Sequence, residues 1–294
     1  MPRLECVPNV SEGRRPEVIE RLVAAVRDGG AAVLDVSSDP DHNRSVLTLA
    51  GEPESLHRSL LALFTVAVAE IDLRTQRGVH PRVGAVDVVP FIPLAGSTMA
   101  EAVAASRRLG EAVAERFALP VYLYEEAASR PERRALPDVR RGGFEGFPAK
   151  MADPVWTPDF GPGQIHETAG VTIVGARFFL IAFNLILDTP DVALARAIAR
   201  EIRAASGGLP AVRALGVYLE SRGRAQVSLN LLDYRQTSVW TAMAAVERAA
   251  AARGAAVAET ELIGLMPEDA MLGVVGQALK LPRFQAENVL WRTP

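Results

Sequence analysis

The sequence predicts a mixed α/β protein built from two tandem units, one in each half of the chain. The chain has 294 residues, more than one domain usually holds, and 49% of them are hydrophobic, enough for two cores. Apolar residues alternate in short strand-like segments and recur with helical spacing in the segments between them. Each half shows the order β-α-β-β-α-β, which is typical of one antiparallel or mixed sheet with helices on one face.

The second half shows this order most clearly. Its predicted elements are a strand at Phe178–Leu187, a helix at Asp191–Ala205, strands at Val212–Leu219 and Ala225–Leu232, a helix at Val239–Arg253 and a strand at Ala255–Leu265. Gly207, Gly208 and Pro210 end the first helix, and Glu220–Gly223 has the composition of a hairpin turn. This arrangement is the split βαβ unit of a ferredoxin-like sandwich.

The first half repeats the order and then adds to it. Its predicted elements are strand Leu4–Val10, helix Pro16–Asp28, strands Ala31–Val36 and Ser45–Ala50, helix Glu54–Ile71 and strand Ala85–Phe91. A helix then starts at Thr98, where Thr98 and Glu101 form a capping box, and runs to Phe117. A strand at Val121–Tyr124 follows, and strand character returns at 170–177.

Residues 125–167 form a long stretch rich in proline, glycine and arginine. A stretch this long inside a compact domain indicates either a functional loop or short helices that the pattern does not reveal. We place the junction between the two domains near Arg177, so that the domains are 1–177 and 178–294.

Composition excludes several classes of function. The formal charge is −3 with acidic and basic residues interleaved, so the chain lacks the basic surface that nucleic acid binding needs. Cys6 is the single cysteine, which excludes an intrachain disulfide and fits a reducing compartment. No export signal and no apolar run of about 18 residues is present. We therefore expect a cytoplasmic protein that binds neither nucleic acid nor membrane.

The segment Leu73–Gly84 contains the residues best suited to chemistry. It holds His80, three arginines, a proline and two glycines within twelve residues. Imidazole titrates near neutrality and can both give and take a proton. Pro81 restricts the backbone of His80, and Arg82 offers a planar fork for a carboxylate. From these residues alone, a solvated loop with a surface histidine remains an equal alternative.

Other polar motifs are weaker. His42 lies in the segment Asp39–Arg44, which has too few spaced ligands for a metal site and is better interpreted as a turn closed by Asp and Asn side chains. We predict no metal. The chain also lacks the glycine-rich loops that hold nucleotide phosphates. Trp156–Gly163 combines aromatic rings, a carboxylate and open backbone, as a pterin-type ring would need, although a simple turn remains possible.

Segments spread over almost the whole chain resemble one family, glutamate formiminotransferase, which also forms the N-terminal part of formiminotransferase-cyclodeaminase. Glu5–Gly13 is similar to the N-terminal signature, and the run from His80 to Pro93, which is very specific, is similar to the central one. The others are Pro120–Tyr124, Pro158–Pro162, Gly175–Arg177, Phe179–Asn184, and Gln226–Ser228 with Asn230–Asp233.

The resemblance implies a folate-dependent transferase of histidine degradation and one-carbon metabolism. Such an enzyme moves the formimino group from N-formimino-L-glutamate to N5 of tetrahydrofolate, its co-substrate. The resemblance also implies a homodimer whose subunits each hold folate between two α/β subdomains. The cyclodeaminase half is absent from this sequence, so we expect the product to pass to another enzyme.

The resemblance also assigns site residues. His80 matches the catalytic histidine. The folate-binding segment matches Asp159, Phe160, Gly161, Pro162, Gly163, Gln164, Ile165, His166, Glu167, Thr168, Ala169 and Gly170. The sequence departs from the mammalian pattern at Gln164–Thr168, which replaces an apolar, aromatic run, and at Ser37, where an aspartate is expected.

Charge and motif position suggest further contacts. Arg44 and Arg82 are candidates for binding the glutamate carboxylates, and Asp35 and Asp87 for orienting His80 or binding the pterin. Three alternatives stay open: a formylglutamate donor, hydrolysis of the donor, and a binding module without catalysis. Hydrolysis is disfavoured because the His/Asp pattern for a metal-bound water is missing.

Overall fold

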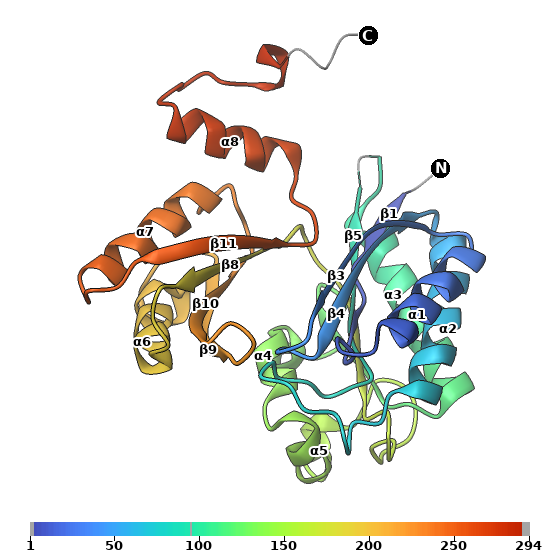
Figure 1. The fold of residues 1–294 in the computed structure, drawn as a ribbon. Coiled ribbons are helices and arrows are strands. Elements are labelled where there is room, and N and C mark those ends of the chain that lie inside the picture. Colours follow the sequence, from blue (N-terminus) through green and yellow to red (C-terminus); the bar gives the residue numbers. More distant parts are fainter. Residues whose placement is uncertain (1–2, 95, 290–294) are drawn as a thin grey trace. The chain divides into compact units, whose positions relative to one another are not determined.

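The computed structural model describes residues 3–94 and 96–289 and divides into two compact units, residues 1–177 and 178–294 (Figure 1). Each unit has its own sheet, with seven strands in the first and four in the second, and its own helices. The predicted mixed α/β class with two subdomains is thereby confirmed.

The first unit contains seven strands and five α-helices among its described residues. In chain order they are β1 (Leu4–Cys6), β2 (Asn9–Val10), α1 (Pro16–Asp28), β3 (Ala32–Asp39), β4 (Arg44–Gly51), α2 (Pro53–Glu70), β5 (Val86–Pro93), α3 (Met99–Phe117), β6 (Val121–Glu125), α4 (Leu136–Arg140), α5 (Gly143–Met151) and β7 (Thr172–Ala176). The expected strand Leu4–Val10 is split into β1 and β2 at Pro8, which has no N–H to donate to a neighbouring strand.

The first sheet is mixed. Its antiparallel part places β1 and β2 between β4 and β5, with β3 outside β4, which is the ferredoxin-like order. β7 then pairs with β5, and β6 with β7, both in parallel. Parallel strands need a crossover connection, and α3 crosses from β5 to β6, which lie on either side of β7. The predicted capping box at the start of α3 is confirmed, since Glu101 N donates to Thr98 Oγ1 and Thr98 N to Glu101 Oε2.

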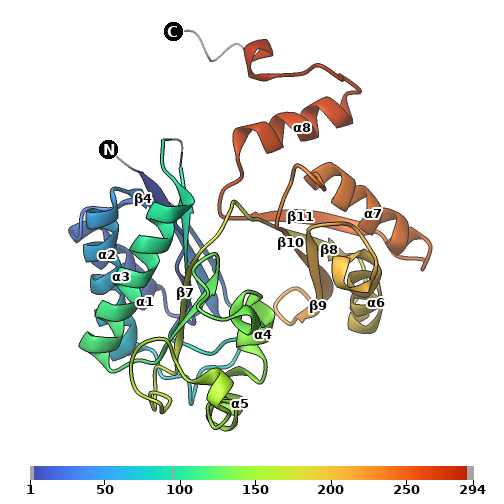
Figure 2. The same cartoon turned by 180° about the vertical axis from the view of Figure 1, so that it is seen from behind.

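Helices cover both faces of the parallel part of this sheet. α1, α2 and α3 lie together on one face (Figure 2), where Val121 and Leu123 of β6 join the main core. Strand alternation sends Tyr122 and Tyr124 to the other face, where they pack with Phe147 of α5. The stretch 125–167 therefore holds the short helices α4 and α5, which the sequence pattern left as an alternative to a functional loop.

The second unit follows the predicted order and adds one helix. Its elements are β8 (Ile181–Leu187), α6 (Val192–Ile202), β9 (Val212–Leu219), β10 (Arg224–Leu231), α7 (Val239–Ala251), β11 (Val257–Ile263) and α8 (Glu268–Ala278). The sheet order is β11-β8-β10-β9 and every pairing is antiparallel. α6 and α7 lie on one face of this sheet (Figure 1).

The helix layer of the second unit lies close to its sheet. A Cβ atom added to Gly216 of β9 would stand 2.3 Å from the backbone nitrogen of Arg196 in α6. The helix residues in this core are small, and Ala195, Ala199 and Ala242 are buried. The two backbones therefore approach to a distance that only glycine permits at this point.

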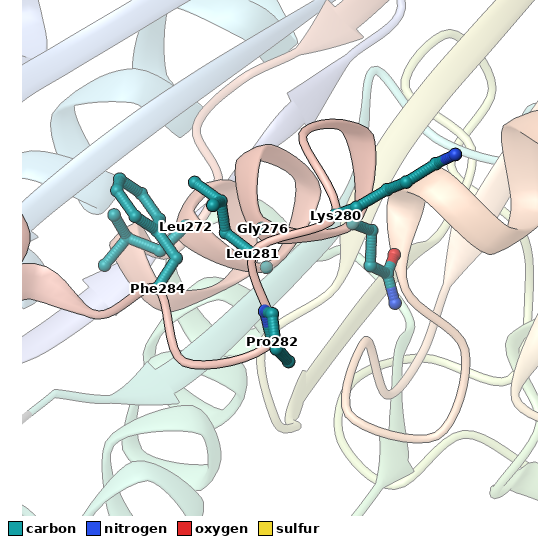
Figure 3. A pocket seen from close by; sticks show the side chains of 8 residues that line it. Leu272, Gly276, Lys280, Leu281, Pro282 and Phe284 are labelled. Atoms are coloured by element: carbon teal, nitrogen blue, oxygen red, sulfur yellow. The ribbon is translucent and has the colours of Figure 1, made fainter.

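The added helix α8 lines a cavity. The cavity has a volume of about 510 Å³ and is lined by α8 and the turn after it, including Leu272, Gly276, Leu281 and Phe284. Figure 3 shows Lys280 extending away from Leu281 and Phe284. No predicted site residue lines this cavity. Among the described residues, no helix is long and apolar enough to cross a membrane.

Candidate functional site

His80 lies in the loop between α2 and β5, and both ends of this loop are held by residues 168–171. Leu73 N donates to Thr168 O at 2.8 Å, Ala85 N to Ala169 O at 2.9 Å, and Val171 N to Val83 O at 3.0 Å. The end of the predicted folate segment therefore pairs with the backbone on both sides of His80.

The middle of the His80 loop docks on the turn between β3 and β4. Val79 N donates to Asp41 O at 3.1 Å, and Asn43 Nδ2 donates to Arg77 O at 2.9 Å. A Cβ atom on Gly78 would stand 2.1 Å from His42 O, so the contact requires glycine.

Asp39 closes the β3–β4 turn as predicted, whereas the Asn43 side chain bonds outside the turn, to Gly13 N and Arg77 O. Asp39 Oδ1 accepts hydrogen bonds from the backbone N–H groups of Asp41 and His42, each at 2.8 Å. Within residues 3–94 and 96–289, no group of three or more His, Cys, Asp or Glu side chains could hold a metal ion.

Arg82 clamps the base of the loop. Its Nε donates to Gln76 Oε1 at 2.6 Å and its Nη2 to Leu73 O at 3.2 Å. The same guanidinium pairs with Glu145 of α5 at 2.9 Å. The planar fork that we expected to bind a substrate carboxylate is thus engaged within the chain.

The His80 ring is half-buried, and its Nε2 atom is buried without a hydrogen-bond partner among the described residues. The His42 ring packs against it edge to face, with the ring centroids 5.6 Å apart. Burial lowers the pKa of His80 well below 6.5, and the positive charges of Arg44 and Arg140 and the His42 ring lower it further. At neutral pH His80 is therefore an uncharged imidazole.

A charged cluster from three elements stands beside His80. Arg44 of β4 donates to Asp87 Oδ2 at 2.9 Å and to Asn9 Oδ1 at 2.6 Å, and Arg140 of α4 also pairs with Asp87 Oδ2. Asp87 is fully buried. Two guanidinium groups share one carboxylate, so the cluster carries a net positive charge.

The pKa values within the cluster follow from this arrangement. Burial lowers the pKa of Arg44 to about 10, helped by Arg140, so Arg44 stays charged at neutral pH. Burial raises the pKa of Asp87, but the two arginines and the N–H of Val83 outweigh it and bring the pKa below 3.8. Asp87 is therefore ionised.

The two predicted aspartates occupy different surroundings. Asp87 Oδ1 accepts from Val83 N at 2.9 Å, so its hydrogen bonds go to the arginines and to the end of the His80 loop. Asp35, on β3, accepts from the Ser37 hydroxyl at 2.9 Å. The structure brings Arg44 and Asp87 to the surroundings of His80 and gives Asp35 a neighbour on its own strand.

The predicted folate segment follows α5, passes irregularly beside the start of β6 and leads into β7, and its middle is exposed. Phe160 O accepts from Val121 N at 2.9 Å, and residues 161–164 are exposed. Gly161 and Gly170 have φ values of +87° and +73°, and Cβ atoms there would stand 2.4 Å from Leu119 O and 2.1 Å from Val83 O. Both ends of the segment are therefore glycine-dependent turns packed on neighbouring backbone.

Two polar side chains of this segment are paired within the chain. Asp159 accepts from Leu123 N at 2.8 Å and from Arg133 Nη1 at 2.6 Å, and also pairs with Ser129. His166 Nδ1 accepts from Ala169 N at 3.1 Å. These contacts shape the segment and attach it to β6.

Sequence reasoning missed two residues near His80, His42 and Arg140. The sequence places His42 in a turn but does not show that it contacts His80, because that contact depends on how the β3–β4 turn packs against the His80 loop. Arg140 lies in a five-residue helix without a readable period. The one available signal was Pro137, since proline favours the first turn of a helix.

Two family models match this chain. The formiminotransferase domain, N-terminal subdomain, matches residues 3–177, and the formiminotransferase domain matches residues 182–279. The chain belongs to the formiminotransferase family. This confirms the resemblance read from the sequence.

Curated relatives align with more than nine-tenths of this chain. A glutamate formimidoyltransferase of Streptococcus pyogenes serotype M1 is 42% identical over 282 residues, covering 96% of this chain and 94% of the relative. One of Thermoplasma acidophilum is 40% identical over 295 residues, covering 99% and 97%. A formimidoyltransferase-cyclodeaminase of Rattus norvegicus is 41% identical, covering 92% of this chain and 51% of the relative. The prediction of a formimidoyltransferase enzyme is confirmed.

The solved structures that align with this chain are only distantly similar to it. A microcompartment protein from Desulfitobacterium hafniense DCB aligns over 92% of this chain and 97% of that chain, at 13% identity and a TM-score of 0.24.

Proposed function

We propose that the chain transfers the formimino group of N-formimino-L-glutamate to N5 of tetrahydrofolate and that His80 moves the proton. The observation that carries the proposal is the uncharged imidazole of His80, whose buried Nε2 has no partner among the described residues. It stands beside a cationic cluster in a chain about 40% identical to glutamate formimidoyltransferases.

The reaction needs one proton removed and one supplied. A bond forms between the folate N5 and the formimino carbon, and N5 loses its proton. The bond between that carbon and the glutamate nitrogen breaks, and the nitrogen gains a proton. His80 Nε2 is free to accept the first proton and can donate it in the second step, a contribution of about 10² to 10⁴ in rate.

The cationic cluster is suited to bind a carboxylate of the donor. Asp87 balances only one of the two guanidinium groups, and Arg44 and Arg140 are each 13% exposed. We assign the donor carboxylate to Arg44, with Arg140 beside it. Arg82 is the weaker candidate because Gln76, Leu73 O and Glu145 engage its guanidinium. Ionised Asp87 holds the two arginines together, and Asp35 remains a candidate for the pterin.

We assign folate binding to Asp159–Gly170. The exposed backbone of residues 161–164 offers N–H and C=O groups to a heterocycle. Residues 168–171 pair with the His80 loop, so folate held by this segment would lie close to the proton acceptor.

We further assign 1–177 and 178–294 to the two formiminotransferase subdomains and expect a homodimer without a metal. The matched ranges 3–177 and 182–279 support the division. The dimer is tested by sedimentation, and the absence of a metal by full activity after dialysis against a chelator.

One assay tests the function. Pure protein is mixed with N-formimino-L-glutamate and tetrahydrofolate, and 5-formiminotetrahydrofolate is followed by mass spectrometry. The proposal expects product only when both substrates are present. Faster turnover of N-formylglutamate would show a formyl donor, and donor loss without folate would show a hydrolase. If no donor gave any product, the result would support a binding module and overturn the proposal.

A further inference from the structure

We propose that His42 is a positioning residue that sets the orientation of the His80 ring through direct ring packing. The inference rests on the proposed function, in which His80 moves the proton. It adds a second histidine, from the β3–β4 turn, that acts on the reaction only through His80.

The first observation is that, within the described part of the chain, the Nε2 atom of His80 is not held by a hydrogen bond, whereas the ring is in contact with His42. The ring contact that the structure gives His80 is with His42, edge to face at 62° and with centroids 5.6 Å apart. This is a favoured geometry for two flat rings. With no hydrogen bond from the described residues at Nε2 to fix the ring, its packing against His42 helps to keep it in one rotamer.

The second observation is that His42 is itself firmly placed. His42 is only 9% exposed, and its backbone N–H donates to Asp39 Oδ1. Its carbonyl oxygen lies against Gly78, two residues before His80, and Val79 N bonds to Asp41 O. The turn and the loop are thus joined by their backbones on the side where the rings meet.

Charge gives His42 a second influence on His80. The groups around the two rings are Arg44 from β4, Arg140 from α4 and Asp87 from β5, with Asp39 and Asp41 in the turn that carries His42. A protonated His42 adds positive charge next to His80 and opposes its protonation. Replacing His42 with an uncharged ring should therefore raise the pKa of His80.

Two variants separate packing from charge. His42→Ala removes the ring and should lower kcat by about three- to tenfold, the rate equivalent of one aromatic pair, with little change in the KM for tetrahydrofolate. His42→Phe keeps a flat ring and should restore most of kcat, while the acid limb of the pH profile moves to higher pH. His57→Ala, which removes a half-buried imidazole from α2, is the matched control and should change neither.

The titration of His80 can be measured without turnover, so it tests the role of His42 even if the proposed function is wrong. The chain has four histidines, so single variants assign every imidazole signal in an NMR titration. The His80 signal should titrate at higher pH in His42→Phe than in the wild type. An unchanged His80 titration together with unchanged kcat in His42→Ala would overturn the inference. So would equal loss of kcat in Ala and Phe variants accompanied by a lower Tm, since that marks a purely structural role.

Discussion

Replacing His80 with alanine removes the proposed proton carrier while leaving the two arginines and Asp87 in place. At pH 7 His80 is almost wholly uncharged, because its pKa lies well below 6.5. In the wild type nearly every His80 side chain can therefore accept a proton at this pH, and the variant loses the whole of this contribution to the rate. We expect kcat to fall by about 10² to 10⁴, and the KM for tetrahydrofolate to change little because binding is spread over other groups.

The pH profile gives the second part of this test. A base must be uncharged, so wild-type kcat/KM should hold from neutrality downward and fall only near the lowered pKa of His80. The unperturbed value of imidazole would instead place this limb near neutrality. His80→Ala should lack the limb, and added imidazole should restore part of the activity by entering the vacated space.

Two outcomes would refute the reasoning. Near-normal kcat in His80→Ala would remove His80 from the proton path. Weakened folate binding with kcat intact would make it a contact only. His57→Ala serves as the control for losing an imidazole from the same unit.

Three further predictions concern the framework of the site. Gly170→Ala should lower Tm and raise the KM for tetrahydrofolate, because φ at Gly170 is +73° and the new Cβ would meet Val83 O at 2.1 Å. The control Gly163→Ala, whose Cβ meets nothing within 4 Å, should leave Tm unchanged. Equal Tm values for the two variants would contradict this explanation. Asp159→Ala should cost about 3–5 kcal/mol in urea unfolding, because buried Arg133 loses its carboxylate and keeps only the carbonyl oxygens of Val155 and Thr157. The variant should also weaken tetrahydrofolate binding, and an unchanged Kd would remove Asp159 from the folate site. The pKa of His80 is lower in the folded chain than the unfolded value near 6.5, so the unfolded state takes up more protons and stability should fall as pH drops from about 6.5 towards the folded pKa. Tm measured against pH should show this fall in the wild type, and a slope just as steep in His80→Ala would exclude His80 as its source.

The elements were predictable where one local rule decides them. Strand Val212–Leu219 and helix Pro16–Asp28 have the predicted bounds because alternation, an early proline and a closing glycine pair act within a few residues. The added helix α8 was not predicted. The parallel pairing of β7 between β5 and β6 was not predictable either, because β7 lies about 50 residues from β6 and about 85 residues from β5 in the sequence.

The site shows the same division. His80 stood out through its neighbours in the chain and through the family resemblance. Arg140 comes close to His80 through the docking of α4 beside Asp87. His42 comes close to it through the pairing of β4 and the contact between the β3–β4 turn and the His80 loop. Arg82 had the right chemistry for a carboxylate, but the sequence could not show that Gln76 and Glu145 already engage its guanidinium.

The close approach of β9 and α6 sets a size limit on how the second unit can change over evolution. At Gly216 the limit comes from backbone atoms of Arg196 at 2.3 Å, which no rotamer change can move aside. Hydrophobicity is therefore a poor guide to tolerance there, since leucine or valine would push the helix off the sheet. In a saturation library, this position should accept glycine alone, whereas Gly223, whose Cβ meets nothing within 4 Å, should be limited only by its positive φ.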